Sequence, residues 1–129
     1  MTLVVDTSAI FAYLFSDDKF HLPAVGVVNS KQKMLMPYTV FEEVLALSYH
    51  RLGKEKAVII RKNIIDSDMI KIVYIGPNEE IQIGELFGNT KRVIDYVDAS
   101  VYWLSKKKNL PVFGFDRHFK GLDIELIPI

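Results

Sequence analysis

Four acidic residues are placed where they could do metal chemistry: Asp6, Glu43, Asp98 and Asp116. Asp6 and Asp116 each come directly after a short apolar run, and buried parallel strands place such residues at the edge of a sheet where ligands bind. Carboxylates that converge without cation partners repel one another, and a hard divalent cation removes that cost. Oxygen ligands suit Mg²⁺ or Mn²⁺. Such a site activates water and holds a phosphodiester for in-line attack.

Two of these acids also have a simpler interpretation. Asp6 precedes Thr7 and Ser8 and is suited to cap a helix. Asp116 is suited to a turn, and Gly114 two residues earlier indicates a bulge or a close backbone approach. Taken singly, such positions are weak indications of a metal site. The four acids together, all at or near the ends of expected elements, favour one.

Glu43 lies on an amphipathic helix that the periodicity predicts over residues 39–53, with Thr39 as a possible cap and Gly53 as its end. At about 100° per residue, Glu43 falls at the edge of the apolar arc and Glu42 falls outside it. A carboxylate at the core edge is costly unless it is paired or bound to a metal. The alternative is a boundary glutamate that reaches water. The predicted arc consists of Val40, Phe41, Val44, Leu45 and Leu47.

Asp95 and Asp98 are three residues apart at the start of a further predicted helix. This spacing suits a cap at Asp95 with Asp98 as its partner in the first turn, where the helix dipole favours both charges. The same placement would hold the Asp98 carboxylate rigidly at a helix start. Both interpretations stay open from the sequence.

The elements that must position these acids alternate between strand and helix. This order predicts an α/β fold with a mainly parallel sheet and helices on both faces. The predicted strands cover residues 3–6, 33–38, 70–75, 111–115 and 124–129, and the predicted helices cover residues 8–15, 20–32, 39–53, 54–65, 77–89 and 96–109.

Composition limits the alternatives. The chain has 129 residues with 50% hydrophobic and 25% charged residues, which suits one domain over residues 1–129. It has no cysteine, so any metal must be held by oxygen or by its three histidines. Its net charge is zero, which argues against coating nucleic acid by bulk charge. No apolar run approaches the length of a membrane span, and we expect a cytoplasmic protein.

Four segments together resemble the PIN domain family, specifically the small PIN ribonucleases of the VapC toxin type. They are "VVDTSAI", "TVFEEVLALSYHRLGKEKA", "VDASVYWLSKK" and "VFGFDRHFKGLDIELIP", which together span nearly the whole chain. The resemblance implies a three-layer α/β/α sandwich and a Mg²⁺- or Mn²⁺-dependent endoribonuclease. It also implies frequent dimerisation, and in toxin-type members an antitoxin encoded alongside, whose tail covers the active site. By this resemblance the metal-binding, catalytic acids are Asp6, Glu43, Asp98 and Asp116.

Other positions follow from the same resemblance. Ser8 falls where the family often has a small polar residue beside the metal. Asp95 falls where many members have a small polar residue, so it either supports the site or simply caps the helix. Gly114 departs from the pattern, because many members carry threonine or serine there. Its missing hydroxyl removes one expected support of Asp116.

Arg117 and His118, which follow the predicted strand 111–115 and Asp116, are candidates for other roles. Arg117, directly after an acid, is the residue that we expect to contact RNA phosphate. We expect His118 to lie at the surface or contact substrate and not to act as a general base, because a metal already lowers the pKa of water.

Two alternative functions are compatible with an aspartate after the first strand of an α/β fold. A phosphatase of the haloacid-dehalogenase kind needs a second aspartate two residues after the first, where this chain has Ser8. The remaining alternative is a PIN-like module that binds RNA or a protein without catalysis, which loss of an acid would indicate. All four acids are present, so catalysis is favoured.

Overall fold

A computed structural model describes residues 1–128. Its five strands form one parallel sheet in the order β3-β2-β1-β4-β5. The fold is a three-layer α/β/α sandwich, as the strand–helix alternation predicted. The strands are β1 (Thr2–Val5), β2 (Lys33–Pro37), β3 (Ile70–Val73), β4 (Val112–Phe113) and β5 (Leu126–Ile127).

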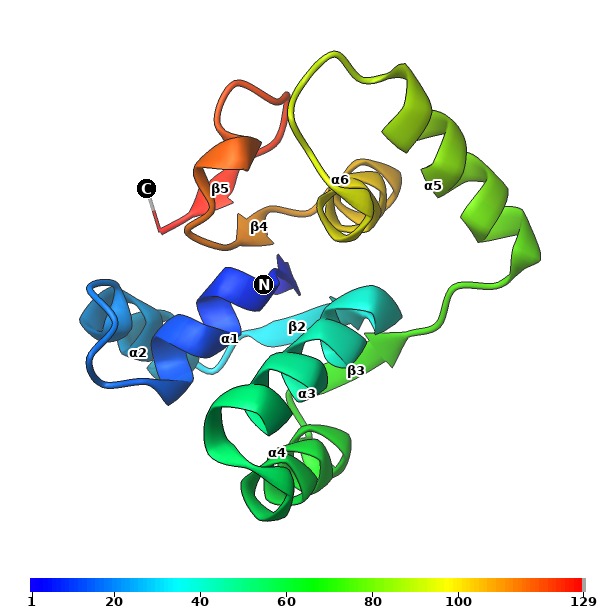
Figure 1. Cartoon of the computed structure of the whole chain (residues 1–129). Coiled ribbons are helices and arrows are strands. Elements are labelled where there is room, and N and C mark those ends of the chain that lie inside the picture. Colours follow the sequence, from blue (N-terminus) through cyan, green and yellow to red (C-terminus); the bar gives the residue numbers. More distant parts are fainter. Residues whose placement is uncertain (129) are drawn as a thin grey trace.

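Helices lie on both sides of the sheet. In Figure 1, α1 to α4 occupy the lower side, and α5 and α6 the upper side. Right-handed crossovers explain this, because the chain moves one way along the sheet from β1 to β3 and then returns to β4. The helices are α1 (Thr7–Leu14), α2 (His21–Asn29), α3 (Tyr38–Leu52), α4 (Lys54–Asp66), α5 (Pro77–Asn89), α6 (Tyr96–Lys108) and the single turn η1 (Arg117–Phe119).

The core is built from the central strands, which are apolar on both faces because helices cover both. Leu3, Val4 and Val5 of β1 and Val112 and Phe113 of β4 are fully buried. Val4 pairs with Val112 and Val5 with Phe113, so the carboxyl ends of these two strands lie side by side. The connections after β1 and β4 then leave toward opposite ends of the sheet, which creates a crevice at that edge.

Helix α3 differs from its prediction in two respects. It begins at Tyr38 after Pro37, so Thr39 lies inside the first turn and does not cap the helix. Proline fits that position because it lacks the N–H that a helix start leaves unpaired. The predicted apolar arc is correct at Val40, Phe41 and Val44, but Leu47 is 45% exposed and Ser48 is buried in its place. The buried face of α3 is therefore shifted from the predicted one, from Leu47 toward Ser48.

None of the helices within residues 1–128 has the length and hydropathy needed to cross a membrane.

Candidate metal centre

Asp6 both caps a helix and lies at the crevice. It follows β1 directly, is 3% exposed, and accepts a hydrogen bond from the Ser8 backbone N–H at 3.2 Å as the N-cap of α1. The Ser8 hydroxyl donates to the same carboxylate oxygen, Oδ2, at 2.7 Å. The two interpretations of Asp6 are thus compatible, because the cap fixes the carboxylate at the carboxyl end of the central strand.

Ser8 also joins the two strands of the crevice. Its hydroxyl accepts from the Phe115 N–H at 2.9 Å, which ties the start of α1 to the chain just after β4. A Cβ at Gly114 would lie 3.0 Å from the Asp6 Cβ. Such a contact is tighter than most Cβ contacts, so a side chain at position 114 would require Asp6 to shift by a few tenths of an ångström. Ser8 therefore fixes the Asp6 side of the crevice, at a point where Gly114 lets the chain after β4 pass close to Asp6.

Asp98 comes to the crevice from α6. Asp95 Oδ1 accepts from the Asp98 N–H at 2.8 Å, and Asp98 Oδ2 accepts from the Asp95 N–H at 3.1 Å, so the two form a capping box. Asp98 is nevertheless 5% exposed. A capping carboxylate normally faces water, so its burial indicates a second role for Asp98.

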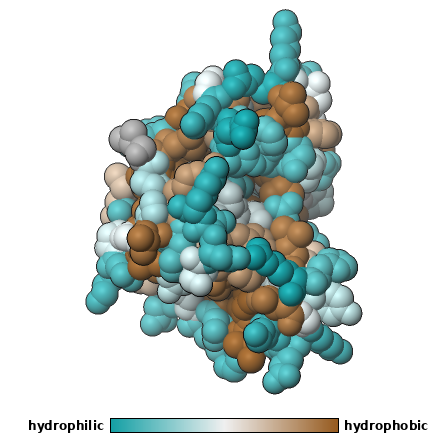
Figure 2. Space-filling model, turned by 60° about the vertical axis from the view of Figure 1, so that its left-hand side comes forward, coloured by the Kyte–Doolittle hydropathy of each residue, from teal (hydrophilic) through white to brown (hydrophobic). Residues whose placement is uncertain are grey.

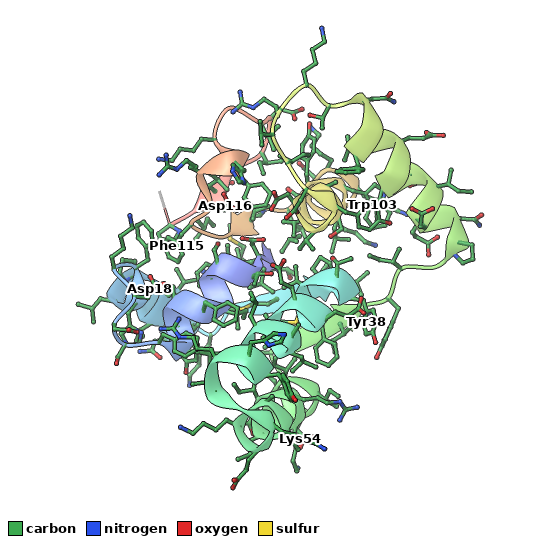
Figure 3. The ribbon with its side chains drawn as sticks, viewed as in Figure 1. Asp18, Tyr38, Lys54, Trp103, Phe115 and Asp116 are labelled. Carbon is green, nitrogen blue, oxygen red and sulfur yellow. The ribbon has the colours of Figure 1, made fainter. Side chains whose placement is uncertain are left out.

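Asp116 and His118 complete the cluster from the turn after β4. Asp116 caps η1 by accepting from the His118 N–H at 2.9 Å, and its side chain is 30% exposed. His118 Nδ1 lies 3.2 Å from Asp116 Oδ1 and 3.6 Å from Asp98 Oδ2. One ligand atom from each of these three residues lies within 4.8 Å of the others. Figure 3 labels Asp116, on the loop that faces α6.

Burial and mutual repulsion make the inner carboxylates reluctant to ionise. Desolvation raises the pKa of Asp6 to about 6, with a further rise from the Asp116 charge, against the lowering effect of the Ser8 hydrogen bonds. Desolvation likewise raises the pKa of Asp98 to about 7, aided by the charges of Asp95, Asp6 and Asp116. A divalent cation bound between these three carboxyl groups would stabilise their charged forms and offset their mutual repulsion.

Glu43 is less tightly placed. It is half-buried on the second turn of α3, and it is not among the three residues whose ligand atoms cluster within residues 1–128. One turn earlier, the Thr39 hydroxyl lies 2.5 Å from the Ser100 hydroxyl of α6, which in turn donates to the Val97 carbonyl. The contact joins the helix that carries Glu43 to the helix that carries Asp98. Glu43 therefore stays a predicted ligand.

Two arginines beside the cluster, Arg117 and Arg92, differ in their contacts within the protein. Arg117 is exposed and has no ion-pair partner within the described part of the chain. Arg92 instead donates to the Lys120 carbonyl and lies against Gly121. Gly121 has a φ of 87°, and a Cβ there would lie 2.7 Å from the Arg92 guanidinium. Arg92 thus links the loop before α6 to the loop after η1, whereas Arg117 remains available to a ligand.

Sequence reasoning missed the position of His118. The prediction that it lies at the surface is correct in part, because its side chain is 45% exposed, but it also contacts two of the acids. The available signal was its spacing two residues after Asp116. A residue two positions after Asp116 contacts that carboxylate only if the chain turns sharply between them. The turn η1 has this effect and places the His118 ring beside Asp116.

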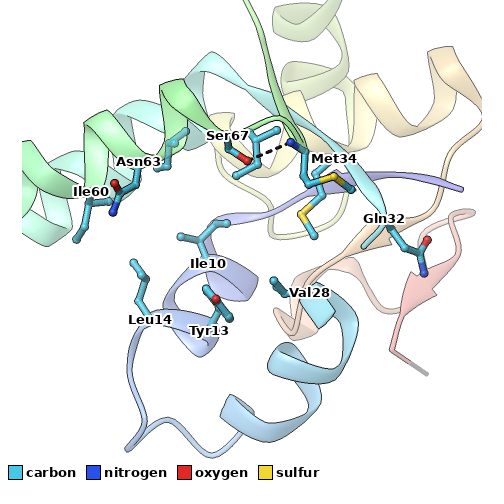
Figure 4. A pocket seen from close by; sticks show the side chains of 12 residues that line it. Ile10, Tyr13, Leu14, Val28, Gln32, Met34, Ile60, Asn63 and Ser67 are labelled. Atoms are coloured by element: carbon cyan, nitrogen blue, oxygen red, sulfur yellow. Dashed lines mark hydrogen bonds between the residues drawn. The ribbon is translucent and has the colours of Figure 1, made fainter. Parts of the chain in front are cut away.

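A separate apolar pocket lies away from the acids. It has a volume of about 360 Å³ and is lined mainly by α1, α2 and α4 near the amino ends of β2 and β3. Figure 4 shows Ile10, Leu14 and Val28 facing this space, with Ile60 across from them. The opposite ends of the sheet are therefore chemically distinct, one acidic and one apolar.

The fold and the cluster define a class: a parallel α/β/α domain with carboxylates gathered at the switch point of its sheet. The PIN domain matches residues 3–125, and the chain belongs to the PIN domain family. No curated protein matches the sequence at a significant level.

Solved structures share the fold at low identity. VapC20 of Mycobacterium tuberculosis, described as a toxin that cleaves the sarcin-ricin loop, matches with a TM-score of 0.84, 23% identity and 95% coverage of both chains. FitAcB of Neisseria gonorrhoeae matches with a TM-score of 0.70 and 16% identity, over 98% of this chain and 96% of that one. VapBC2 of Rickettsia felis, bound to a promoter DNA fragment, has a TM-score of 0.70 and 13% identity, covering 98% and 97%.

Proposed function

We propose that this protein is a divalent-metal-dependent endoribonuclease of the VapC toxin type. The observation that carries the proposal is the cluster of Asp6, Asp98 and Asp116 at one end of the sheet, two of them buried with raised pKa values. Burying carboxylates this close together is costly unless a cation binds them. Membership of the PIN family and the toxins among similar solved structures support the same reading.

The donor set fits the metal that the family implies. Asp6, Asp98 and Asp116 would hold it, with Glu43 contributing directly or through water, and carboxylate oxygens suit Mg²⁺ or Mn²⁺. When bound, such a cation supplies Lewis-acid stabilisation of the phosphate and lowers the pKa of a coordinated water. These four residues are therefore the proposed catalytic residues.

The protein's own groups have distinct tasks in this proposal. The Ser8 hydroxyl fixes the orientation of the Asp6 carboxylate through its 2.7 Å hydrogen bond. Asp95 fixes Asp98 through the capping box. Arg117, exposed beside Asp116, contacts a phosphate of the RNA and aligns the strand across the crevice. The arrangement requires no side chain as general base.

The decisive experiment compares the wild-type protein with Asp6→Asn on a pool of structured and unstructured RNAs. We expect cleavage with Mg²⁺ or Mn²⁺, none with chelator, and none with the variant. Calorimetric titration of the same two proteins with Mn²⁺ distinguishes the alternative, a non-catalytic PIN-like binding module. Metal binding by the wild type without cleavage of any RNA would favour that module, and absence of metal binding would contradict the metal-dependent mechanism.

An antitoxin partner is also proposed. Several similar solved structures are toxin–antitoxin complexes, including one from Klebsiella pneumoniae. The apolar pocket between α1, α2 and α4 offers a surface for an apolar segment of such a partner. Co-expression with the products of neighbouring genes, with and without Leu14→Asp, tests this. A stable complex that forms equally well with Leu14→Asp would show that the pocket is not the binding surface.

Self-association as a homodimer or a higher oligomer is also proposed. Figure 2 shows hydrophobic side chains in several separate patches on one face, interrupted by hydrophilic ones. Exposed apolar residues also lie on other helices, for example Leu47 and Tyr49 on α3 and Phe87 on α5. Sedimentation velocity would test the predicted dimer, which a single monomeric species at high concentration would contradict.

A further inference from the structure

Among the described residues, 1–128, His118 is the basic side chain that forms ion-pair contacts with the acidic cluster. Within residues 1–128, the only ion-pair contacts of Asp98 and Asp116 are with this imidazole, at 3.6 Å and 3.2 Å. Both contacts involve the same ring atom, Nδ1. The ring therefore directs one nitrogen at two carboxylates that come from different elements, α6 and η1.

The backbone holds His118 in this orientation. Its N–H donates to Asp116 Oδ1 at 2.9 Å, and the Phe119 N–H donates to the Asp116 carbonyl at 3.2 Å, which closes the η1 turn. Phe119 itself is 1% exposed and packs in the core. The turn that carries His118 is thus anchored on both sides, by the cap at Asp116 and by the buried ring of Phe119.

The distances suit ligands of a shared ion. Metal–ligand bonds to nitrogen and oxygen are about 2.0–2.2 Å long, so two adjacent ligands of one ion lie about 3 Å apart, and opposite ones about 4 Å apart. The three ligand atoms of Asp98, Asp116 and His118 already lie within 4.8 Å of one another. A small inward movement of these side chains would therefore complete a shared coordination sphere.

His118 has an alternative role, as a counter-ion of the carboxylates instead of a metal ligand. A protonated imidazole would act as a counter-ion that partly neutralises the carboxylates, and it would then compete with a metal ion. A protonated imidazole supplies one positive charge to the carboxylates, whereas a divalent ion supplies two. The two roles predict opposite effects of removing His118 on metal affinity.

We propose that His118 Nδ1 is a ligand of the metal centre and that this nitrogen makes the centre select Mn²⁺ over Mg²⁺. The inference rests on the proposed function, because it requires that the carboxylates bind a metal. Mg²⁺ accepts oxygen ligands almost exclusively, whereas imidazole strengthens binding of first-row transition-metal ions. His118 would then bind in the tautomer that carries its proton on Nε2.

Variants at His118 separate the ligand from the counter-ion. His118→Ala removes the nitrogen, and His118→Asn places an amide oxygen close to the position of Nδ1. His50→Ala is the matched control, because His50 is an exposed histidine near the end of α3 with no contact to the cluster in the described residues. Circular dichroism melts of all three variants establish that each is folded before metal is added.

The measurement is Mn²⁺ binding followed by electron paramagnetic resonance, with Mg²⁺ affinity taken from competition. We expect pulsed spectra of the wild type and of His50→Ala to show coupling to a histidine nitrogen, and both His118 variants to lack it. His118→Ala should weaken Mn²⁺ binding at least about tenfold while leaving Mg²⁺ affinity nearly unchanged. His118→Asn should retain Mg²⁺ affinity and lose the preference for Mn²⁺.

Other results would overturn the proposal in distinguishable ways. If the wild type binds Mn²⁺ without nitrogen coupling, the acids hold the metal and the proposed function stands, but His118 is not a ligand. If His118→Ala binds Mn²⁺ more tightly than the wild type, His118 is a competing counter-ion. If the wild type binds neither Mn²⁺ nor Mg²⁺, the metal-dependent function itself fails.

Discussion

The crevice has an inner and an outer half, and they are built differently. The inner half is Asp6 and Asp98, 3% and 5% exposed, both held by hydrogen bonds at helix starts. The outer half is Asp116 and His118, whose side chains are 30% and 45% exposed on a single turn. The pKa values of the inner pair are raised by burial. Ionisation of the carboxyl groups is therefore most costly in the inner half, whereas the side chains of the outer half are accessible to solvent and to ligands.

The largest expected effect comes from neutralising the inner half. Asp98→Asn should lower RNA cleavage about a thousandfold or more, because the loss of a metal ligand removes several kcal/mol of transition-state stabilisation. It should also raise the melting temperature of the metal-free protein, because the amide avoids a costly buried charge and still accepts from the Asp95 N–H. Cleavage rates and thermal melts in chelator measure the two effects.

Asp116→Asn is the matched comparison in the outer half. It should also abolish cleavage but leave the melting temperature of the metal-free protein almost unchanged, because its side chain is partly solvated. Equal stabilisation by both variants would mean that the two halves do not differ in the way their burial indicates.

The second effect is on the pH dependence of stability. The pKa values of Asp6 and Asp98 are about 6 and about 7 in the folded protein and near 3.9 when unfolded, so the folded state binds more protons between these values. The free energy of unfolding should therefore fall as pH rises from about 4 to about 7, by up to about 3 kcal/mol for Asp6 alone. Calorimetric melts in chelator across this window measure it.

Bound metal should reverse that trend. Metal binding requires ionised carboxylates, so the stabilisation by Mn²⁺ should grow as pH rises through the same window. Stability that increases with pH in the presence of chelator would contradict the raised pKa values of the inner pair.

The third effect concerns Ser8, whose hydroxyl joins Asp6 to the chain just after β4. Ser8→Ala removes the donor to Asp6 and leaves the Phe115 N–H without its acceptor, which should cost about 1–3 kcal/mol. The pKa of Asp6 should rise further, since the Ser8 hydrogen bonds lower it. Urea unfolding measures the loss. The control is Ser30→Ala, an exposed hydroxyl that donates to Val27, with an expected change within about 0.5 kcal/mol.

The smallest effect is at the rim of the outer half. Arg117→Ala should weaken RNA binding and lower the slope of log affinity against log salt by about 1, without altering Mn²⁺ affinity. Filter binding of RNA to the Asp6→Asn background at several salt concentrations measures this. Arg61→Ala, an exposed arginine on α4, is the control. An unchanged salt slope in Arg117→Ala would remove Arg117 from the RNA contact.

The inner half was largely predictable from the sequence. Buried parallel strands are continuous apolar runs, so the end of β1, and Asp6 directly after it, can be located from local pattern alone. The Asp95–Asp98 spacing likewise predicts its capping box, which is confirmed. The wrong details of α3 have a local cause and a distant one. Pro37 precedes the helix start at Tyr38, and the packing of α1, α4 and α6 against α3 decides which of its residues are covered.

The outer half was not predictable in the same way. The position of His118 depends on one turn of η1, and a turn of three residues leaves no periodicity to detect. The second role of Ser8, as acceptor of the Phe115 N–H, joins residues that are distant in sequence. The place of Gly114 against Asp6 likewise arises only when β4 lies beside β1. Contacts between segments far apart in the chain were therefore the part that the sequence alone left undetermined.

The pairing of β1 with β4 has a consequence for synthesis. Val4 pairs with Val112, so the acids after these strands meet only when a late segment of the chain has emerged from the ribosome and inserted beside the first strand. Such long-range pairing is a slow step in folding, and chains grow at about 5–20 residues per second. The nascent chain therefore carries Asp6 for most of its synthesis without Asp116 or His118. The proposed metal centre would thus remain incomplete until translation of the domain is almost finished.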